Sequence, residues 1–243
     1  MTTHLWILIG AMFLLAGLVK GVIAMGLPTV AMGLLAMVLP PAEAAALLVI
    51  PSLVTNVWQL LAGPRFGALA RRLWPMMAGV LLGTVASTNV LAGNLAGVAS
   101  IGLGVALTVY ALVGLAGLKL VLAPRHESWL GPLVGATTGL VTGATGVFVI
   151  PAVPYLQAIG LEKEDLIQAL GLSFTVSTIA LALGLLRVDA WHVGSVWMSL
   201  LALVPALVGM QLGQVLRQRI SAATFRRVFF AGLLLLGLYL ALA

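Results

Sequence analysis

The chain has 243 residues, of which 62% are hydrophobic and only 7% are charged, and its mean hydropathy is +1.20. A soluble domain carries roughly 25% charged residues, so a soluble fold of this chain would lack a polar surface. The composition therefore excludes a soluble protein and indicates an integral membrane protein.

The formal net charge of +6 would suggest nucleic-acid binding in a soluble protein. Here the basic residues lie between apolar runs, which the positive-inside rule explains, so we expect no nucleic-acid partner. The absence of cysteine excludes disulfides, thiolate metal sites and thiol chemistry, and no metal site or cofactor is predicted. The N-terminus lacks a basic region and a cleavage site, so we interpret the first apolar run as a membrane segment.

At about 20 residues per crossing, the first half contains five apolar segments. They are predicted over about 5–19, 22–39, 42–62, 73–91 and 98–122. The first two are joined by Leu18–Thr29, a run whose single charge is Lys20 and which contains Gly21, Gly26 and Pro28. Glycine and proline weaken helical hydrogen bonding, so this run predicts a break.

The second half repeats this count after a central link. Its segments are predicted over about 129–142, 147–159, 166–186, 191–216 and 228–243. A second glycine-rich run, Gly139–Gly146, is followed by Pro151 and comes about half a chain after the first. Breaks at matching places in two halves are typical of the binding site of a secondary transporter.

Positive charge concentrates in alternate loops, at 65–72, 119–127 and 217–227. This predicts that these loops are cytoplasmic and that both termini lie on the opposite side. Five segments per half would also invert the second half relative to the first. We therefore predict an all-α polytopic membrane protein of about eight to ten segments in two inverted repeats, residues 1–122 and 129–243, joined by a cytoplasmic linker at 123–128.

Two alternatives stay open at this point. Segments 1, 6 and 7 are short for a roughly 30 Å core, so the pairs 1–2 and 6–7 either cross or form re-entrant hairpins. The recurring glycines also have a second explanation, because small residues allow close helix packing in any membrane bundle.

Neutral polar side chains follow each predicted break. In the third segment they are spaced i, i+3, i+4 and i+7, which places them on one helical face. Hydroxyls, amides and backbone N–H groups at helix ends suit a dehydrated anion, although each could instead form an ordinary interhelical hydrogen bond. The candidate substrate-binding residues are Lys20, Gly21, Gly26, Pro28, Thr29, Ser52, Thr55, Asn56, Gln59, Thr142, Gly143, Thr145, Gly146, Gln168, Ser173, Thr175 and Ser177.

Lys20 is the sharpest of these candidates, because an ionisable side chain inside a membrane is costly and marks a functional site by default. Its alternative role is to extend from the end of a short helix to the cytoplasmic headgroups. The choice depends on whether the first two segments fold back into the protein. Enzyme motifs such as His-Glu-x-x-His, Gly-x-Ser-x-Gly and Walker A are absent from the sequence, which predicts no enzymatic activity.

The sequence resembles the TauE/SafE family of membrane transporters in three features. They are the glycine and proline pattern Gly17, Gly21, Gly26 and Pro28, the run Ala42–Ala46 leading into Pro51–Ser52, and the recurrence of this pattern after half the chain length. This family is also called the sulfite exporter or TSUP family, and the resemblance covers nearly the whole chain.

The resemblance implies export of sulfite or organosulfonates such as sulfoacetate or taurine-like compounds across the bacterial inner membrane, without a soluble cofactor. We expect alternating access, a proton as coupling ion, and partners limited to the anion, the lipid bilayer and a second copy of the chain in a homodimer. The alternatives are an anion channel and a non-transporting membrane subunit of a sulfur-metabolising system.

Overall fold

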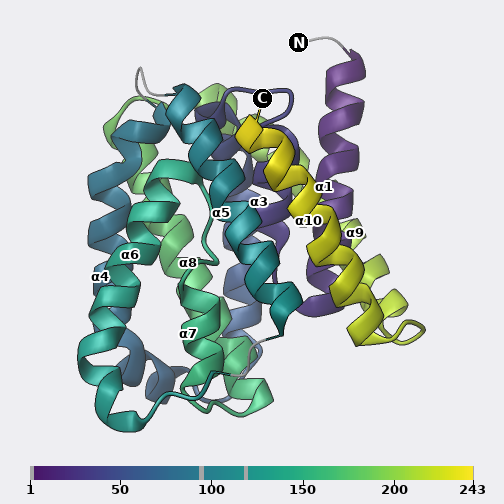
Figure 1. The fold of residues 1–243 in the computed structure, drawn as a ribbon. Coiled ribbons are helices and arrows are strands. Elements are labelled where there is room, and N and C mark those ends of the chain that lie inside the picture. The colour runs from purple at the N-terminus through teal and green to yellow at the C-terminus, as the bar shows by residue number, and fades with distance from the viewer. Residues whose placement is uncertain (1–2, 93–95, 118–119, 243) are drawn as a thin grey trace.

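A computed structural model describes residues 3–92, 96–117 and 120–242, and this part of the chain is entirely helical (Figure 1). One short 3₁₀ helix, η1 (Pro124–His126), separates the two halves. The α-helices are α1 (Thr3–Ile23), α2 (Leu27–Leu35), α3 (Pro41–Leu61), α4 (Phe66–Ala92), α5 (Ala96–Ala116), α6 (Glu127–Thr145), α7 (Ala152–Ala158), α8 (Lys163–Arg187), α9 (Val193–Arg217) and α10 (Ala222–Leu242).

Seven helices of the described chain are long and apolar enough to cross a membrane, namely α1, α3, α4, α5, α8, α9 and α10. The nine residues of α2 and the seven of α7 would extend only about 14 and 10 Å, which is too short for a crossing. Many long apolar side chains on the seven helices are exposed, as a lipid-facing surface requires. The prediction of an all-α polytopic membrane protein is confirmed.

Each short helix turns back inside the bundle. In Figure 1, α2 returns toward the end of the molecule at which α1 begins, and α7 returns toward the end at which α6 begins. Residues 3–35 and 127–158 are thus two helix pairs that enter from opposite ends. Both pairs are therefore hairpins inside the bundle, in which α1 is long enough to cross a membrane and α2 and α7 are not.

The first break is confined to Ala24–Gly26, where Ala24 and Gly26 have φ values of 60° and 97°. Pro28 lies in the first turn of α2, where a missing N–H costs no hydrogen bond. The predicted second segment, 22–39, is therefore wrong in extent, because only Leu27–Leu35 is helical there as α2. Lys20 and Gly21 belong to the last turn of α1 and lie before the break, not within it.

The second break begins at Gly146, whose φ is 72° and whose N–H donates to the carbonyl of Thr142 at 2.7 Å. Residues 147–151 then continue without an α-helix until α7 begins at Ala152. The predicted seventh segment, 147–159, is consequently too long, although the position of the break is as expected.

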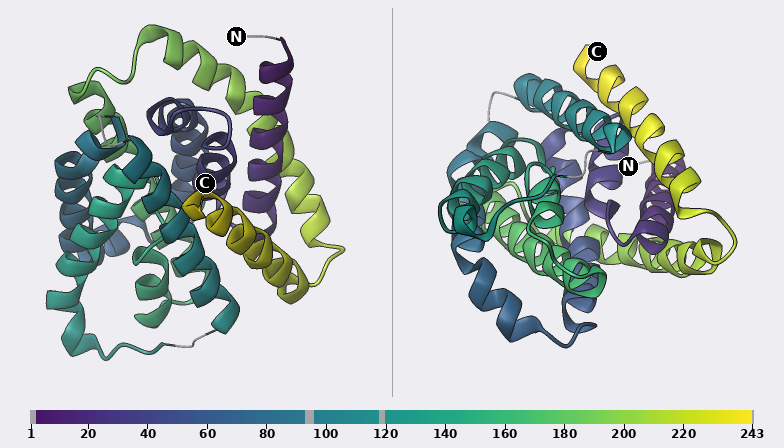
Figure 2. Two further views of the ribbon diagram at one scale, coloured as in Figure 1. Left: turned by 45° about the horizontal axis from the view of Figure 1, so that its top comes forward. Right: turned by 60° about the horizontal axis from the view of Figure 1, so that its bottom comes forward.

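The long helices pack in pairs that link the two halves. α1 lies along α9, α6 along α4, α3 against α8, and α5 against α10. Figure 2 shows the last pair side by side at one edge of the bundle. Every one of these four pairs joins a helix of residues 3–117 to a helix of residues 127–242, so neither half forms a separate bundle.

Glycines allow the closest of these approaches. A Cβ added to Gly17 of α1 would lie 2.0 Å from the carbonyl oxygen of Ala206 on α9, and one added to Gly139 of α6 would lie 2.4 Å from that of Val80 on α4. The two glycines thus occupy corresponding places in two corresponding helix pairs. The inverted repeat itself stays a prediction.

Candidate functional site

Lys20 is enclosed by protein. The residue is 4% exposed, and its Nζ donates a hydrogen bond to Oδ1 of Asn56 on α3, which is 0% exposed. The lysine therefore points into the bundle and does not extend to a headgroup region, although α1 is long enough to span a membrane. Of the two roles that the sequence allowed, this geometry fits the internal one.

The hydrogen bonds of Asn56 fix the orientation of its amide. Its Nδ2 donates to Oγ1 of Thr178 on α8 at 3.4 Å. The Thr178 hydroxyl donates its single proton to the carbonyl of Phe174 at 2.7 Å, so it can only accept a hydrogen bond from Asn56. The Asn56 carbonyl oxygen must then face Lys20. A chain of polar groups thus runs from α1 through α3 to α8.

Next to this chain of polar groups, a proline interrupts the backbone hydrogen bonding of α3. Pro51 lies inside the helix and has no N–H for the carbonyl of Leu47. Ser199 of α9 supplies the missing donor at 2.7 Å, and its oxygen accepts the N–H of Ile50 at 3.1 Å. The kinked turn that carries Ser52 is thereby held by a side chain from the other half of the protein.

α3 and α8 run antiparallel through the centre of the bundle. A Cβ added to Gly171 of α8 would lie 2.7 Å from the backbone nitrogen of Leu60, while Thr178 contacts Asn56, nearer the start of α3. Ser173 and Ser177 lie on α8 between these two contacts. The structure therefore brings together the polar stretches of α3 and α8 that the sequence singled out separately.

Several hydroxyls of the described chain are buried without a hydrogen-bond partner. Buried polar groups are nearly always bonded, so hydroxyls without a protein partner are candidates for contact with a ligand. Apart from Thr108 on α5, they belong to Thr29, Ser52, Thr138, Ser173 and Ser177. They are at most 1% exposed, and they add neutral donors from α2, α3, α6 and α8.

Other predicted site residues are already satisfied within their own helices. Thr55, Thr142, Thr145 and Thr175 each donate to the carbonyl four residues earlier, at 2.7 Å. Such bonds are common for threonine in membrane helices and leave the hydroxyl proton unavailable to a ligand. These four are structural residues in this conformation.

The two predicted glutamines join α3 to α8 near one end. Gln59 donates to the carbonyl of Ile167 at 2.8 Å. Gln168 donates to the carbonyls of Leu60 and Gly63 and accepts the N–H of Arg65. Both amides therefore connect helices, which is the alternative role that the sequence left open for them.

The predicted glycines and proline also have structural roles. A Cβ on Gly21 would lie 2.2 Å from the carbonyl oxygen of Met210, and one on Gly143 would lie 2.3 Å from that of Thr84. Gly26 and Gly146 lie in the two breaks described above, and Pro28 lies in the first turn of α2. These residues shape the hairpins, and none of them is joined to Lys20 or Asn56 by a hydrogen bond in the described chain.

The sequence-based site omitted Thr178 and Thr138. Thr178 follows Ser177 directly and lies off the i, i+4 row of Ser173 and Ser177, so only its contact with Asn56 reveals it. Thr138 begins the row that continues with Thr142 and Thr145, and the periodicity of that row was the available signal.

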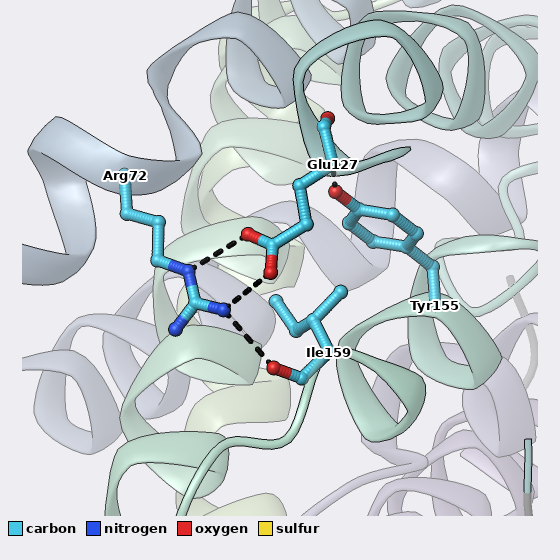
Figure 3. A network of polar contacts seen from close by, with 4 residues as sticks. All are labelled: Arg72, Glu127, Tyr155 and Ile159. Atoms are coloured by element: carbon cyan, nitrogen blue, oxygen red, sulfur yellow. Dashed lines mark hydrogen bonds and ion pairs between the residues drawn. The ribbon is translucent and has the colours of Figure 1, made fainter. Parts of the chain in front are cut away.

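Ion pairs in the described chain lie away from Lys20. Arg72 of α4 forms a two-pronged pair with Glu127, through Nε to Oε2 at 2.9 Å and Nη2 to Oε1 at 2.6 Å (Figure 3). Its Nη2 also donates to the carbonyl of Ile159, 3.0 Å away, and the Tyr155 hydroxyl approaches the Glu127 carbonyl at 3.5 Å. This network fastens the base of the α6–α7 hairpin to α4.

A bundle of membrane-spanning helices, with two hairpins inside it and a buried cation beside neutral hydroxyls, is the architecture of a membrane transporter, not of an enzyme. The profile described as "Sulfite exporter TauE/SafE" matches residues 9–240. The chain therefore belongs to the TauE/SafE family, as the sequence resemblance predicted. No curated protein and no solved structure matches the chain.

Proposed function

We propose that this protein is a secondary transporter that exports small sulfur-containing anions, such as sulfite or organosulfonates, across the bacterial inner membrane by alternating access, with a proton as coupling ion. The observation that carries this proposal is the buried Lys20, which faces the amide of Asn56 and has no carboxylate partner in the described chain. A buried cation without a counter-charge favours an anionic ligand.

Neutral groups buried on α3 and α8 fit the same ligand. Sulfite and sulfonates present several oxygens that accept hydrogen bonds, and Ser52, Ser173 and Ser177 each have a hydroxyl that no protein group uses. Neutral donors satisfy a dehydrated oxyanion without binding it as tightly as several cations would. A carrier must release its cargo, so one cation among hydroxyls is a suitable combination.

The hairpins give alternating access a physical basis. α1–α2 and α6–α7 enter from opposite ends of the molecule, and each packs against a long helix of the other half. The corresponding contacts of Gly17 with α9 and of Gly139 with α4 support two inverted repeats, residues 1–122 and 129–243. Rocking of one such unit against the other would expose a central site to each side in turn.

Flux measurements on purified protein in liposomes test this proposal. Lys20→Met removes the charge at similar length, and Asn56→Leu removes the amide. We expect each to lower sulfite affinity by about 10- to 100-fold, because a charge-assisted hydrogen bond is worth roughly 1.5–3 kcal/mol. The matched controls are Lys163→Met at the exposed start of α8 and Gln211→Leu on the exposed face of α9.

The same assay separates the rival functions. Saturable flux with counterflow supports a transporter, whereas unsaturable flux without counterflow identifies a channel. An absence of flux would favour the subunit without transport of its own, and undiminished flux in both site variants would refute the proposed site. The predicted homodimer is tested separately by the mass of the detergent-solubilised protein.

A further inference from the structure

The interior of the described part of the chain contains one charged side chain. Among the buried residues of the described chain, Lys20 is the only one with a charged side chain. The two carboxylates that are best shielded, Glu127 and Asp165, are engaged by Arg72 and Arg65 at the base of the bundle. The polar region between α1, α3 and α8 is therefore a single cation surrounded by neutral donors.

No second charge approaches this cation from the helices that surround it. α2 contains no ionisable side chain. Apart from Lys20, the ionisable residues of α1, α3, α9 and α10 are exposed, and those of α8 lie at its two ends. The first group is His4, Glu43, Arg217, Arg226, Arg227 and Tyr239, and the second is Lys163, Glu164, Asp165 and Arg187.

We infer that the site selects singly charged sulfur oxyanions, such as hydrogen sulfite and monosulfonates, over doubly charged anions of the same shape. This inference rests on the proposed function and narrows its substrate class. A monoanion beside the Lys20 ammonium forms a neutral pair, which can be buried among hydroxyls. A dianion would leave one negative charge uncompensated in a region of low dielectric, where an unpaired charge is costly.

The hydroxyls do not change the charge that the site can neutralise. Ser52, Ser173 and Ser177 can each donate one hydrogen bond to an anion oxygen, whatever the charge of the anion. They therefore provide for the oxygens of any tetrahedral or pyramidal sulfur oxyanion, while the charge that can be accepted is set by Lys20 alone. Discrimination between monoanions and dianions follows from the count of cations, and shape does not contribute to it.

Competition between two anions of similar shape tests the inference. Methanesulfonate carries one charge and sulfate carries two, and each places oxygens around a tetrahedral sulfur. With labelled sulfite in counterflow and equal pH on both sides of the liposome membrane, we expect methanesulfonate to inhibit at least tenfold more strongly than sulfate. Equal inhibition, or stronger inhibition by sulfate, would overturn the inference.

Two further measurements make the result independent of any single variant. At equal pH on both sides, sulfite counterflow at a fixed total concentration should increase as the pH falls, because more sulfite then carries one charge. Methanesulfonate keeps one charge over this pH range, so its counterflow should rise less than that of sulfite, and an equal rise in both would contradict the inference. Thr178→Lys adds a second cation next to Asn56 and should shift the preference toward sulfate, whereas an unchanged preference in the folded variant would argue against selection by the number of cations.

These outcomes are separable from failure of the proposed function itself. If the protein carries no sulfite at all, the proposed function fails. If sulfite flux is robust and sulfate competes as well as methanesulfonate, only the charge selectivity fails. Lys20→Arg keeps a cation at this position and should preserve the preference for the monoanion, whereas Lys20→Met should weaken competition by methanesulfonate, in line with the roughly 10- to 100-fold loss of sulfite affinity expected above.

Discussion

Met32 of α2 lies directly against Gly146, the residue that ends α6. A Cβ added to Gly146 would be 2.9 Å from the Met32 sulfur, and Met32 is 0% exposed. The short helix of the first hairpin therefore packs against the break of the second hairpin. This contact joins the two hairpins directly, so a movement of one hairpin would be transmitted to the turn of the other.

Gly146→Ala should destabilise the protein for two physical reasons. The φ of 72° costs an L-residue roughly 1–2 kcal/mol, and the new methyl group would crowd the Met32 side chain. The measurement is thermal unfolding in detergent, with Gly232→Ala on α10 as control because a Cβ there meets nothing within 4 Å. Met32→Ala leaves a cavity and is itself destabilising, but in a double-mutant cycle Gly146→Ala should cost less in the Met32→Ala background, by the crowding part only. Full stability of Gly146→Ala alone would contradict this account.

Ser199→Ala should weaken the kinked turn of α3. The substitution leaves the buried Leu47 carbonyl without a donor, since Pro51 has none to offer, at a cost of about 1–2 kcal/mol. We expect a lower unfolding temperature together with a loss of sulfite affinity, because Ser52 follows the proline directly. Ser195→Ala on the same helix is the control, and equal behaviour of the two variants would show that Ser199 does not support the turn.

The Arg72–Glu127 pair should contribute about 1 kcal/mol of coupling, because its two-pronged geometry offsets its partial exposure. A double-mutant cycle with Arg72→Gln and Glu127→Gln, followed by thermal unfolding, measures this coupling free energy. Arg72→Lys should retain less than half of it, since an ammonium cannot bond both carboxylate oxygens and the Ile159 carbonyl in the same planar fork.

Salt provides the control for this pair. The coupling should decrease as ionic strength rises, because Arg72 is exposed enough for its charge to be screened. Coupling that is absent at low salt would mean that the network in Figure 3 does not fasten the hairpin to α4.

The sequence located both breaks, because glycine and proline act on the local backbone. It misjudged how far α1 extends, since Gly21 looks like a helix breaker but packs on the backbone of Met210 and remains helical. That contact comes from α9, almost two hundred residues away, and tertiary packing of this kind overrides local propensity.

The sequence predicted which helical face carries the polar residues of the candidate site, but it did not predict the hydrogen bonds that these residues form. Periodicity placed Ser52 and Thr55 on the same side of one helix. The Thr55 hydroxyl nevertheless donates to the carbonyl of Pro51, whereas the Ser52 hydroxyl has no hydrogen-bond partner in the described chain. Lys20 had two possible environments in the sequence, and only the position of Asn56 on a neighbouring helix decides between them. Side-chain rotamers and helix register carry this information, and neither is encoded in residue spacing.

Gly17→Ala and Gly139→Ala should be destabilising by similar amounts if the two halves are structural repeats. Each methyl group would meet a backbone carbonyl, that of Ala206 on α9 or that of Val80 on α4, and forcing two helices apart in this way typically costs about 1–3 kcal/mol. Gly10→Ala on α1 is the matched control, because a Cβ there has nothing within 4 Å, and it should be neutral or slightly stabilising. Thermal unfolding of the three variants gives the comparison. A large loss for Gly17→Ala with none for Gly139→Ala would mean that the α1–α9 and α4–α6 contacts are not equivalent, and the inverted repeat would lose its main physical support.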